Sequence, residues 1–127
     1  MTKINWGSDL SYLVYKRTYA RAKGKGTEEF TETVDRILEA CNKQLDCGFT
    51  QEEQDELRSY FYDMKGSVAG RFLWQLGTKT VNKLGLLSLQ NCAGVVVNEP
   101  VRPFTWTMDA LMLGCGVGFN LQREFVY

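Results

Sequence analysis

Two apolar segments with a helical segment between them limit what the C-terminal half of this sequence can fold into. Residues 92–97 form a continuous apolar run rich in β-branched side chains, which predicts a strand covered on both faces. Pro103 suits the first turn of a helix, and residues 114–121 form a glycine loop that leads into a second strand. This order predicts two parallel strands joined by a crossover helix. Since two parallel strands are not stable alone, this half requires more sheet than the chain contains.

The N-terminal half instead predicts helices. Ser8 is the expected N-cap of a first helix, and Gly24 and Gly26 are expected to end the stretch that follows. Thr27 is the expected cap of a second helix, and a capping box at residues 50–53 begins a third. The second helix carries an apolar stripe at helical spacing, made of Phe30, Val34, Ile37, Leu38, Cys41 and Leu45. The buried face of the third is expected to consist of Leu57, Tyr60, Phe61 and Met64.

The change of character at about residue 70 divides the chain into a helical region, residues 1–69, and a strand-containing region, residues 70–127. The predicted fold class is therefore α+β or α/β. Lys plus Arg and Asp plus Glu number 15 each, so no net charge draws the chain to nucleic acid or an anionic membrane. Without an apolar run that could span a bilayer, and without a signal peptide, the sequence predicts a cytoplasmic protein.

The four cysteines are irregularly spaced, contain no CxxC pair, and stand in a chain without histidine. A metal site is therefore not expected, and a small thiol oxidoreductase is the least favoured class of function. Cys41 lies on the apolar stripe and is expected in the core, whereas Cys115 lies between glycines and is expected to be more accessible. Cys92 opens the apolar run, where it is either a small core residue or a thiol reductant that faces a cleft.

Two further groups of residues leave a structural and a functional reading open. Gly114, Gly116 and Gly118 follow a helix and precede a strand, the reverse of the order in a dinucleotide-binding motif. They are either a tight turn or a place where the backbone approaches a ligand closely. Arg71 and Trp74 are either a packing corner or an anion contact.

Taken together, several segments resemble the N-terminal part of class II, adenosylcobalamin-dependent ribonucleotide reductases, above all the monomeric ribonucleoside-triphosphate reductases. The segments run in order over nearly the whole chain: Tyr15 to Arg21, Glu29 to Val34, Gly70 to Trp74, Gly77-Thr78, Asn91-Cys92, Pro103-Phe104, Asp109 to Met112 and Gly114 to Phe119. Each motif alone is weak, but the five from Gly70 onward, with Pro103-Phe104 and Asp109 to Met112 counted as one, are specific because they are in register. A class I large subunit is a less similar alternative.

The resemblance implies a helical region followed by the first strands of a ten-stranded α/β barrel, incomplete in this chain. That family converts ribonucleotides to deoxyribonucleotides. Adenosylcobalamin creates a thiyl radical on one cysteine, and two further cysteines reduce the 2′ position and become a disulfide that thioredoxin restores. By resemblance, Cys92 is the first of this reducing pair. The resemblance also implies the substrate-binding residues, which are Asn91, Arg71, Phe72, Cys115 and Gly116.

Two departures from the family matter. The position of Cys115 usually holds glycine, alanine or serine, and the chain stops at Tyr127, where the barrel has hardly begun. We therefore expect a split, intein-interrupted or truncated reductase that needs a complementary C-terminal segment and does not catalyse the reaction alone. The alternative is a non-catalytic nucleotide-binding or regulatory module derived from a reductase.

Overall fold

The computed structural model describes residues 4–122, and the chain divides into two compact units, Met1–Gly77 and Thr78–Tyr127. The helix at Gly70–Gln75 belongs to the first unit, beyond the composition boundary at residue 70. We expected the barrel region to begin at residue 70, and this boundary stays a prediction. Within the described residues, every helix is too short or too polar to cross a membrane.

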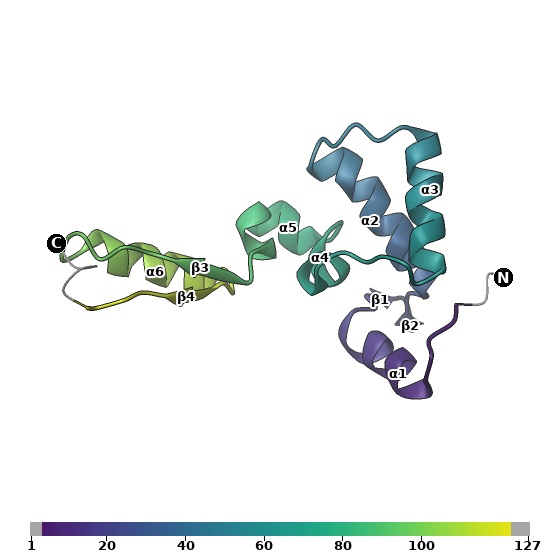
Figure 1. Cartoon of the computed structure of the whole chain (residues 1–127), viewed down its shortest axis with the longest axis horizontal. Helices are drawn as coiled ribbons and strands as arrows, with labels where there is room; N and C mark the ends of the chain where they lie inside the picture. The colour runs from purple at the N-terminus through teal and green to yellow at the C-terminus, as the bar shows by residue number, and fades with distance from the viewer. Residues whose placement is uncertain (1–3, 123–127) are drawn as a thin grey trace. The chain divides into compact units, whose positions relative to one another are not determined.

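The first unit is a helical assembly with one small hairpin (Figure 1). Its elements are α1 (Asp9–Thr18), β1 (Ala22–Lys23), β2 (Gly26–Thr27), α2 (Phe30–Gln44), α3 (Gln51–Tyr62) and α4 (Gly70–Gln75). Both α3 and α4 pack against α2, the longest helix. The apolar stripe that predicts α2 thus marks the helix around which this unit is built.

The helix starts follow the sequence signals except at α2. Ser8 caps α1 by accepting a hydrogen bond from the Ser11 N–H, and Thr50 forms the expected capping box with Glu53. The expectation that Thr27 caps α2 is wrong, because Thr27 pairs with Ala22 in the antiparallel β1–β2 hairpin. The N-cap is Glu29, which forms a capping box of its own with Glu32.

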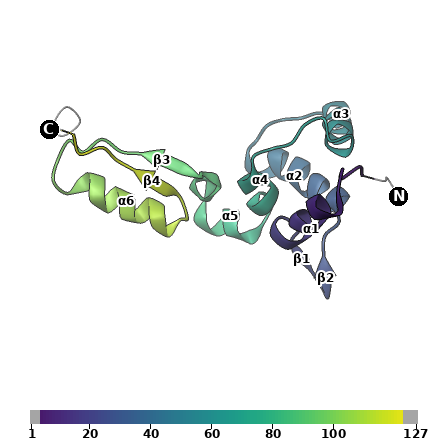
Figure 2. The same ribbon diagram turned by 60° about the horizontal axis from the view of Figure 1, so that its bottom comes forward.

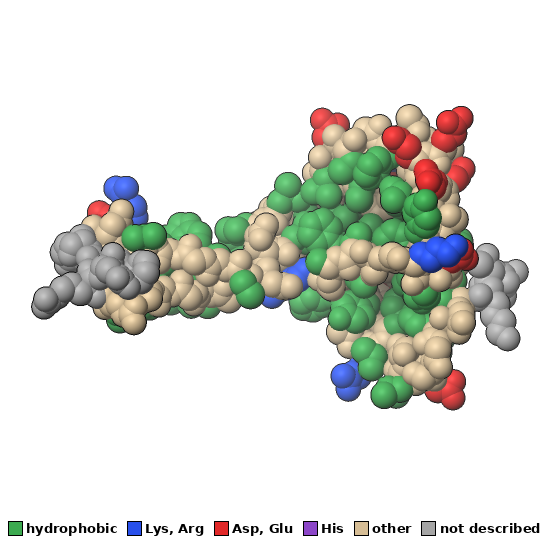
Figure 3. Space-filling view, viewed as in Figure 1, with side chains coloured by type: hydrophobic (Ala, Val, Ile, Leu, Met, Phe, Trp, Pro, Cys, Tyr) green, Lys and Arg blue, Asp and Glu red, His purple; other side chains and the backbone are tan. Residues whose placement is uncertain are grey.

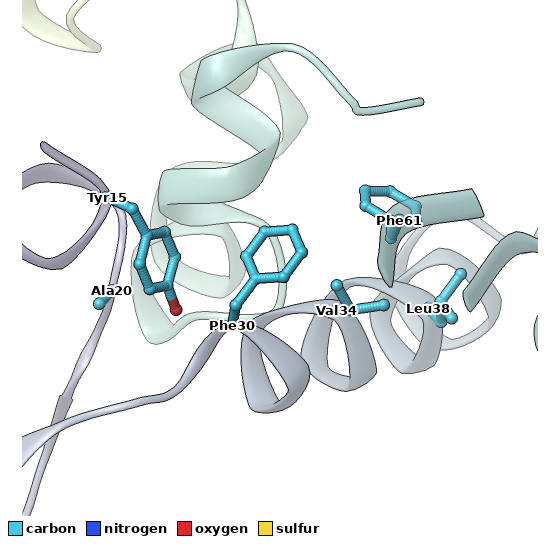
Figure 4. Close-up of a cluster of buried hydrophobic side chains, with 6 residues drawn as sticks. All are labelled: Tyr15, Ala20, Phe30, Val34, Leu38 and Phe61. Carbon is cyan, nitrogen blue, oxygen red and sulfur yellow. The ribbon is translucent and has the colours of Figure 1, made fainter. Parts of the chain in front are cut away.

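The core of the first unit lies between α1, α2 and α3, as Figure 4 shows. Its buried cluster consists of Tyr15, Ala20, Phe30, Val34, Leu38 and Phe61. Cys41 and Leu45, at the far end of the stripe, are only half-buried. Phe61 on α3 is buried, but Tyr60 on α3 and Met64, which lies beyond its end, are 44% and 40% exposed. The buried face is therefore narrower than expected. Hydrophobic side chains accordingly gather on the surface of this unit in Figure 3.

The second unit contains the predicted strand–helix–strand element. It comprises α5 (Lys79–Leu84), the 3-10 helix η1 (Leu86–Leu89), β3 (Cys92–Gly94), α6 (Arg102–Met112) and β4 (Gly116–Gly118). β3 and β4 are parallel, which confirms the predicted pairing, and Figure 2 shows α6 running beside them. However, β3 is shorter than the apolar run, and Val96 beyond it is 64% exposed. The expectation of a strand covered on both faces is therefore wrong for this chain.

Helix α6 buries its small residues and exposes its large apolar ones. Pro103 lies in the first turn as predicted, and it is buried together with Thr107 and Ala110. The exposed apolar side chains of this helix include Phe104, Met108, Leu111 and Met112, with exposed fractions from 40% to 80%. Large apolar side chains are normally buried, so this surface is suited to be covered by further protein.

Gly77 provides a test of how tightly the end of the first unit packs. Its φ of +78° is rare for any other residue, and a Cβ atom there would lie 2.7 Å from Arg36 Cγ and 3.2 Å from Ala40 Cβ. Because strain and overpacking add, we expect Gly77→Ala to lower the free energy of unfolding by about 2–4 kcal/mol in urea denaturation. Gly26→Ala is the control, since a Cβ atom at Gly26 would meet nothing within 4 Å. Equal effects of the two substitutions would contradict the close approach.

Candidate functional site

The ends of the parallel pair bring together four of the residues singled out in the sequence. Cys92 is directly paired with Gly116, and the Gly116 N–H donates a hydrogen bond of 2.8 Å to the Asn91 carbonyl oxygen. At the other end, the Val95 N–H donates to the Gly118 carbonyl oxygen at 3.2 Å. Asn91 and Cys92 are therefore held beside the glycine segment by backbone bonds alone.

One face of this pair carries a thiol and otherwise only glycines. Paired residues of neighbouring strands point to the same face, and alternate residues along a strand share that face. In the register of β3 and β4, this places Cys92, Gly94, Gly116 and Gly118 on one face. All four are exposed, whereas Ala93 and Val117 on the opposite face are half-buried. Within β3 and β4, the Cys92 thiol is thus the one side-chain group on this face, and the rest of it is glycine backbone.

Gly116 lies close to the backbone of the neighbouring strand. A Cβ atom there would lie 3.3 Å from the Asn91 carbonyl oxygen, closer than nearly all such contacts in proteins. The preceding Gly114 has a φ of +85°, which makes the turn between α6 and β4. The turn reading of the glycine segment is thus confirmed, whereas close approach of its backbone to a ligand stays a prediction.

The accessibility predicted for Cys115 is wrong. Cys115 is only 1% exposed, whereas Cys41 is half-buried, so their order is reversed. Cys115 immediately precedes Gly116, and alternation turns its side chain away from the face that carries Cys92. Its N–H donates to the Ala110 carbonyl oxygen at 3.0 Å, which ties it to the end of α6. Any contact that Cys115 makes with a ligand on the open face must come from its backbone.

Arg71 and Phe72 belong to the first unit, where both are half-buried on α4. The Arg71 guanidinium lies 6.0 Å from the centre of the Trp74 ring, and that of Arg21 lies 5.4 Å from the same ring. This arrangement of two guanidinium groups beside one aromatic ring is compatible with either role of Arg71, packing against Trp74 or contact with an anion. The substrate contacts expected of Arg71 and Phe72 stay predictions.

Gly94 is the residue of this site that sequence reasoning missed. It was part of an apolar run, and its place opposite Gly118 becomes apparent only from the strand register. The signal was present as two matching patterns, Cys-x-Gly at residues 92–94 and Gly-x-Gly at residues 116–118. A period of two in both segments places the small residues on one face.

Comparison with known proteins identifies the class to which this fold and site belong. The ribonucleotide reductase alpha domain family matches residues 2–78. A probable adenosylcobalamin-dependent ribonucleoside-triphosphate reductase of Dictyostelium discoideum is 33% identical over 91% of this chain and 17% of its own length. Reductases with the same cofactor and substrate in their names, from Euglena gracilis and Lactobacillus leichmannii, are 34% and 32% identical over 87% and 96% of this chain.

A solved structure agrees with these relatives. The crystal structure of a B-12 dependent, class II ribonucleotide reductase matches 98% of this chain with a TM-score of 0.75 and 28% identity. The chain belongs to the class II, adenosylcobalamin-dependent ribonucleotide reductases and corresponds to their N-terminal region. It spans about a fifth of the length of these relatives, with 17% to 21% of each covered.

Proposed function

We propose that this chain supplies the N-terminal part of an enzyme that converts ribonucleotides to deoxyribonucleotides by thiyl-radical chemistry. The helical first unit precedes the barrel, and β3, α6 and β4 are the start of its ten-stranded α/β sheet. The substrate is a ribonucleoside triphosphate, in line with the names of the relatives. The observation that carries the proposal is the Cys92 thiol on an otherwise bare glycine face.

Cys92 acts as one thiol of the reducing pair. A ribose placed on the open face would meet the thiol without steric hindrance, because Gly94, Gly116 and Gly118 have no side chains. In the reaction, Cys92 and a second cysteine outside this chain supply two electrons and two protons. The 2′-hydroxyl leaves as water, a hydrogen takes its place, and the two sulfurs join as a disulfide. A thioredoxin-like dithiol then reduces that disulfide by exchange.

The substrate contacts in this proposal follow the family resemblance. Gly116 offers its backbone on the bare face, and Asn91 lies directly before Cys92 at the start of β3. Cys115 contributes its backbone, and Arg71 with Phe72 contributes the remaining contacts. Asn91 is exposed and its carbonyl oxygen is engaged by the Gly116 N–H, so any contact of Asn91 with the substrate uses its other polar groups.

The other residues that the reaction needs would come from a complementary C-terminal reductase segment. Bound adenosylcobalamin supplies the radical that begins the reaction. We assign none of its contacts to this chain, because the bare face offers one thiol and glycine backbone and is suited to a sugar rather than a corrin ring. The exposed apolar side chains of α6 are the surface that the complementary segment would cover.

A chimaeric enzyme tests this proposal. The chain replaces the matching N-terminal segment of the Lactobacillus leichmannii relative, and deoxyribonucleotide formation is measured with adenosylcobalamin, a dithiol reductant and a ribonucleoside triphosphate. We expect turnover by the chimaera and none by the relative without the segment. A folded chimaera that binds nucleotide but gives no product would favour the alternative of a non-catalytic nucleotide-binding module.

A further inference from the structure

The connection between α2 and α3 places two cysteines side by side. Cys41 lies in the last turn of α2, and the chain then folds back so that the Cys47 N–H donates a 3.1 Å hydrogen bond to the Cys41 carbonyl oxygen. Positive φ angles at Asp46 (52°) and Gly48 (68°), on either side of Cys47, make this reversal possible. The Cys47 side chain is near enough to Cys41 to raise the pKa of the Cys41 thiol.

A neighbouring side chain holds this arrangement in place. The Asn42 amide nitrogen donates to the Phe49 carbonyl oxygen at 2.8 Å, and the Phe49 N–H donates to the Asn42 amide oxygen at 2.8 Å. These two hydrogen bonds join the Asn42 side chain to the Phe49 backbone and so close the loop between them. Cys47 is therefore fixed over the end of α2 by bonds on both sides of it.

We propose that Cys41 and Cys47 form a redox-active dithiol that closes to an intramolecular disulfide by exchange with an external disulfide. Disulfides need Cα atoms about 4.4–6.8 Å apart. The direct hydrogen bond from the Cys47 N–H to the Cys41 carbonyl oxygen brings the two backbones together, as such a disulfide requires. The proposal does not rest on the proposed reductase function, because both cysteines lie in the first unit and Cys92 lies in the second.

The disulfide forms in two exchange steps, and the difference in exposure between Cys41 and Cys47 sets their order. Cys47 is exposed and Cys41 is half-buried, so the external disulfide is attacked first by Cys47. That step forms a mixed disulfide and releases one external thiol. Cys41 then attacks the Cys47 sulfur, which releases the second external thiol and leaves the Cys41–Cys47 bond. The protein pair loses two electrons, and the external disulfide gains them.

The environment of Cys41 fits the second role. Burial first, and then the charge and hydrogen bond of Cys47, raise the pKa of the Cys41 thiol. A raised pKa keeps Cys41 protonated and poorly reactive toward outside reagents at neutral pH. It becomes useful as a nucleophile only against the sulfur directly beside it.

Equilibration in glutathione buffers tests the pair in the full chain. Trypsin cuts after Lys43, between the two cysteines, and a disulfide would join the peptides 37–43 and 44–58. We expect this joined species in the folded chain at a glutathione disulfide level at least tenfold lower than in concentrated guanidinium chloride. Tenfold corresponds to about 1.4 kcal/mol by which the fold favours the bond. Equal levels in folded and unfolded chain would overturn the proposal.

Single variants separate the two thiols. Cys41→Ser is expected to leave Cys47 trapped as a stable mixed disulfide with glutathione, because the resolving thiol is gone. Asn42→Ala should raise the glutathione disulfide level needed to form the joined peptides, since it frees the loop. If wild-type Cys47 instead accumulates as the mixed disulfide, Cys41 does not resolve it and the proposal is wrong.

Discussion

Replacing Arg36 with methionine is expected to lower the free energy of unfolding of the first unit by about 3–5 kcal/mol, the usual effect of breaking a buried ion pair. The Arg36 guanidinium donates to both carboxylate oxygens of Glu28, at 2.9 and 3.0 Å. It also donates to the carbonyl oxygens of Leu73, at 2.8 Å, and of Leu76 at the end of α4. Methionine keeps most of the apolar stem but leaves a buried carboxylate and these carbonyl groups without their partner.

Urea denaturation followed by fluorescence would measure this effect, because Trp6 and Trp74 lie in the first unit. The control is Lys43→Ala, which breaks an ion pair with Glu39 whose side chains are 71% and 62% exposed. Exposed pairs of this kind contribute at most about 0.5 kcal/mol. An Arg36→Met effect no larger than that of the control would show that the buried pair does not stabilise the fold.

The ion pair between Glu28 and Arg36 also makes the stability of the first unit fall at acid pH. Burial alone would raise the pKa of the Glu28 carboxyl, but hydrogen bonds from Arg36 and Thr33 and the charge of Arg36 hold this pKa below its ordinary value of 4.5. The folded state therefore binds the Glu28 proton less readily than the unfolded state does. This contribution to stability is present above the ordinary pKa and is lost as the pH falls below it. Arg36→Met removes the bonds and the charge of Arg36 but leaves the hydrogen bond from Thr33, so this acid-induced loss should become smaller.

How far the sequence predicts the first unit depends on whether a signal is local. The stripe from Phe30 to Leu38 and the capping box at Thr50 lie within single helices, and both are confirmed. The pair between Glu28 and Arg36 also links to carbonyl groups some forty positions away, and no local pattern marks those partners. Thr27 was misassigned as a helix cap because it belongs to a hairpin whose strands have two residues each. Strands that short leave no periodic signal in the sequence.

The candidate site shows the same limit. The parallel pairing of β3 and β4 follows from the order of apolar segments, and it is confirmed. Which side chains share a face depends on register, which a shift of one residue would invert. The glycines on either side of Cys115 led us to expect an accessible thiol. Its side chain instead points to the face opposite that of Gly116, where it is buried. The role of Cys92 stays a prediction, and only chemistry can test it.

Cys92→Ser, in the chimaera with the Lactobacillus leichmannii relative, is expected to reduce deoxyribonucleotide formation by about a thousandfold or more. Loss of a reacting group commonly has an effect of this size or larger. Serine occupies nearly the same space on the exposed face and leaves the backbone bonds between β3 and β4 intact, so folding should be preserved. A hydroxyl group cannot form the disulfide that accompanies reduction of the 2′ position. Product formation measured by chromatography, with nucleotide binding measured in parallel, separates loss of chemistry from loss of substrate.

Cys47→Ser is the matched thiol control, because Cys47 is also exposed but lies in the first unit. Under excess dithiol reductant it should leave turnover within about twofold of the unsubstituted chimaera, since neither an ion pair nor core packing is lost at an exposed position. If Cys92→Ser also keeps full turnover, the bare glycine face is not where the ribose is reduced. If Cys92→Ser binds nucleotide normally and forms no product, the thiol on that face takes part in the reduction, because serine leaves the backbone of the face unchanged.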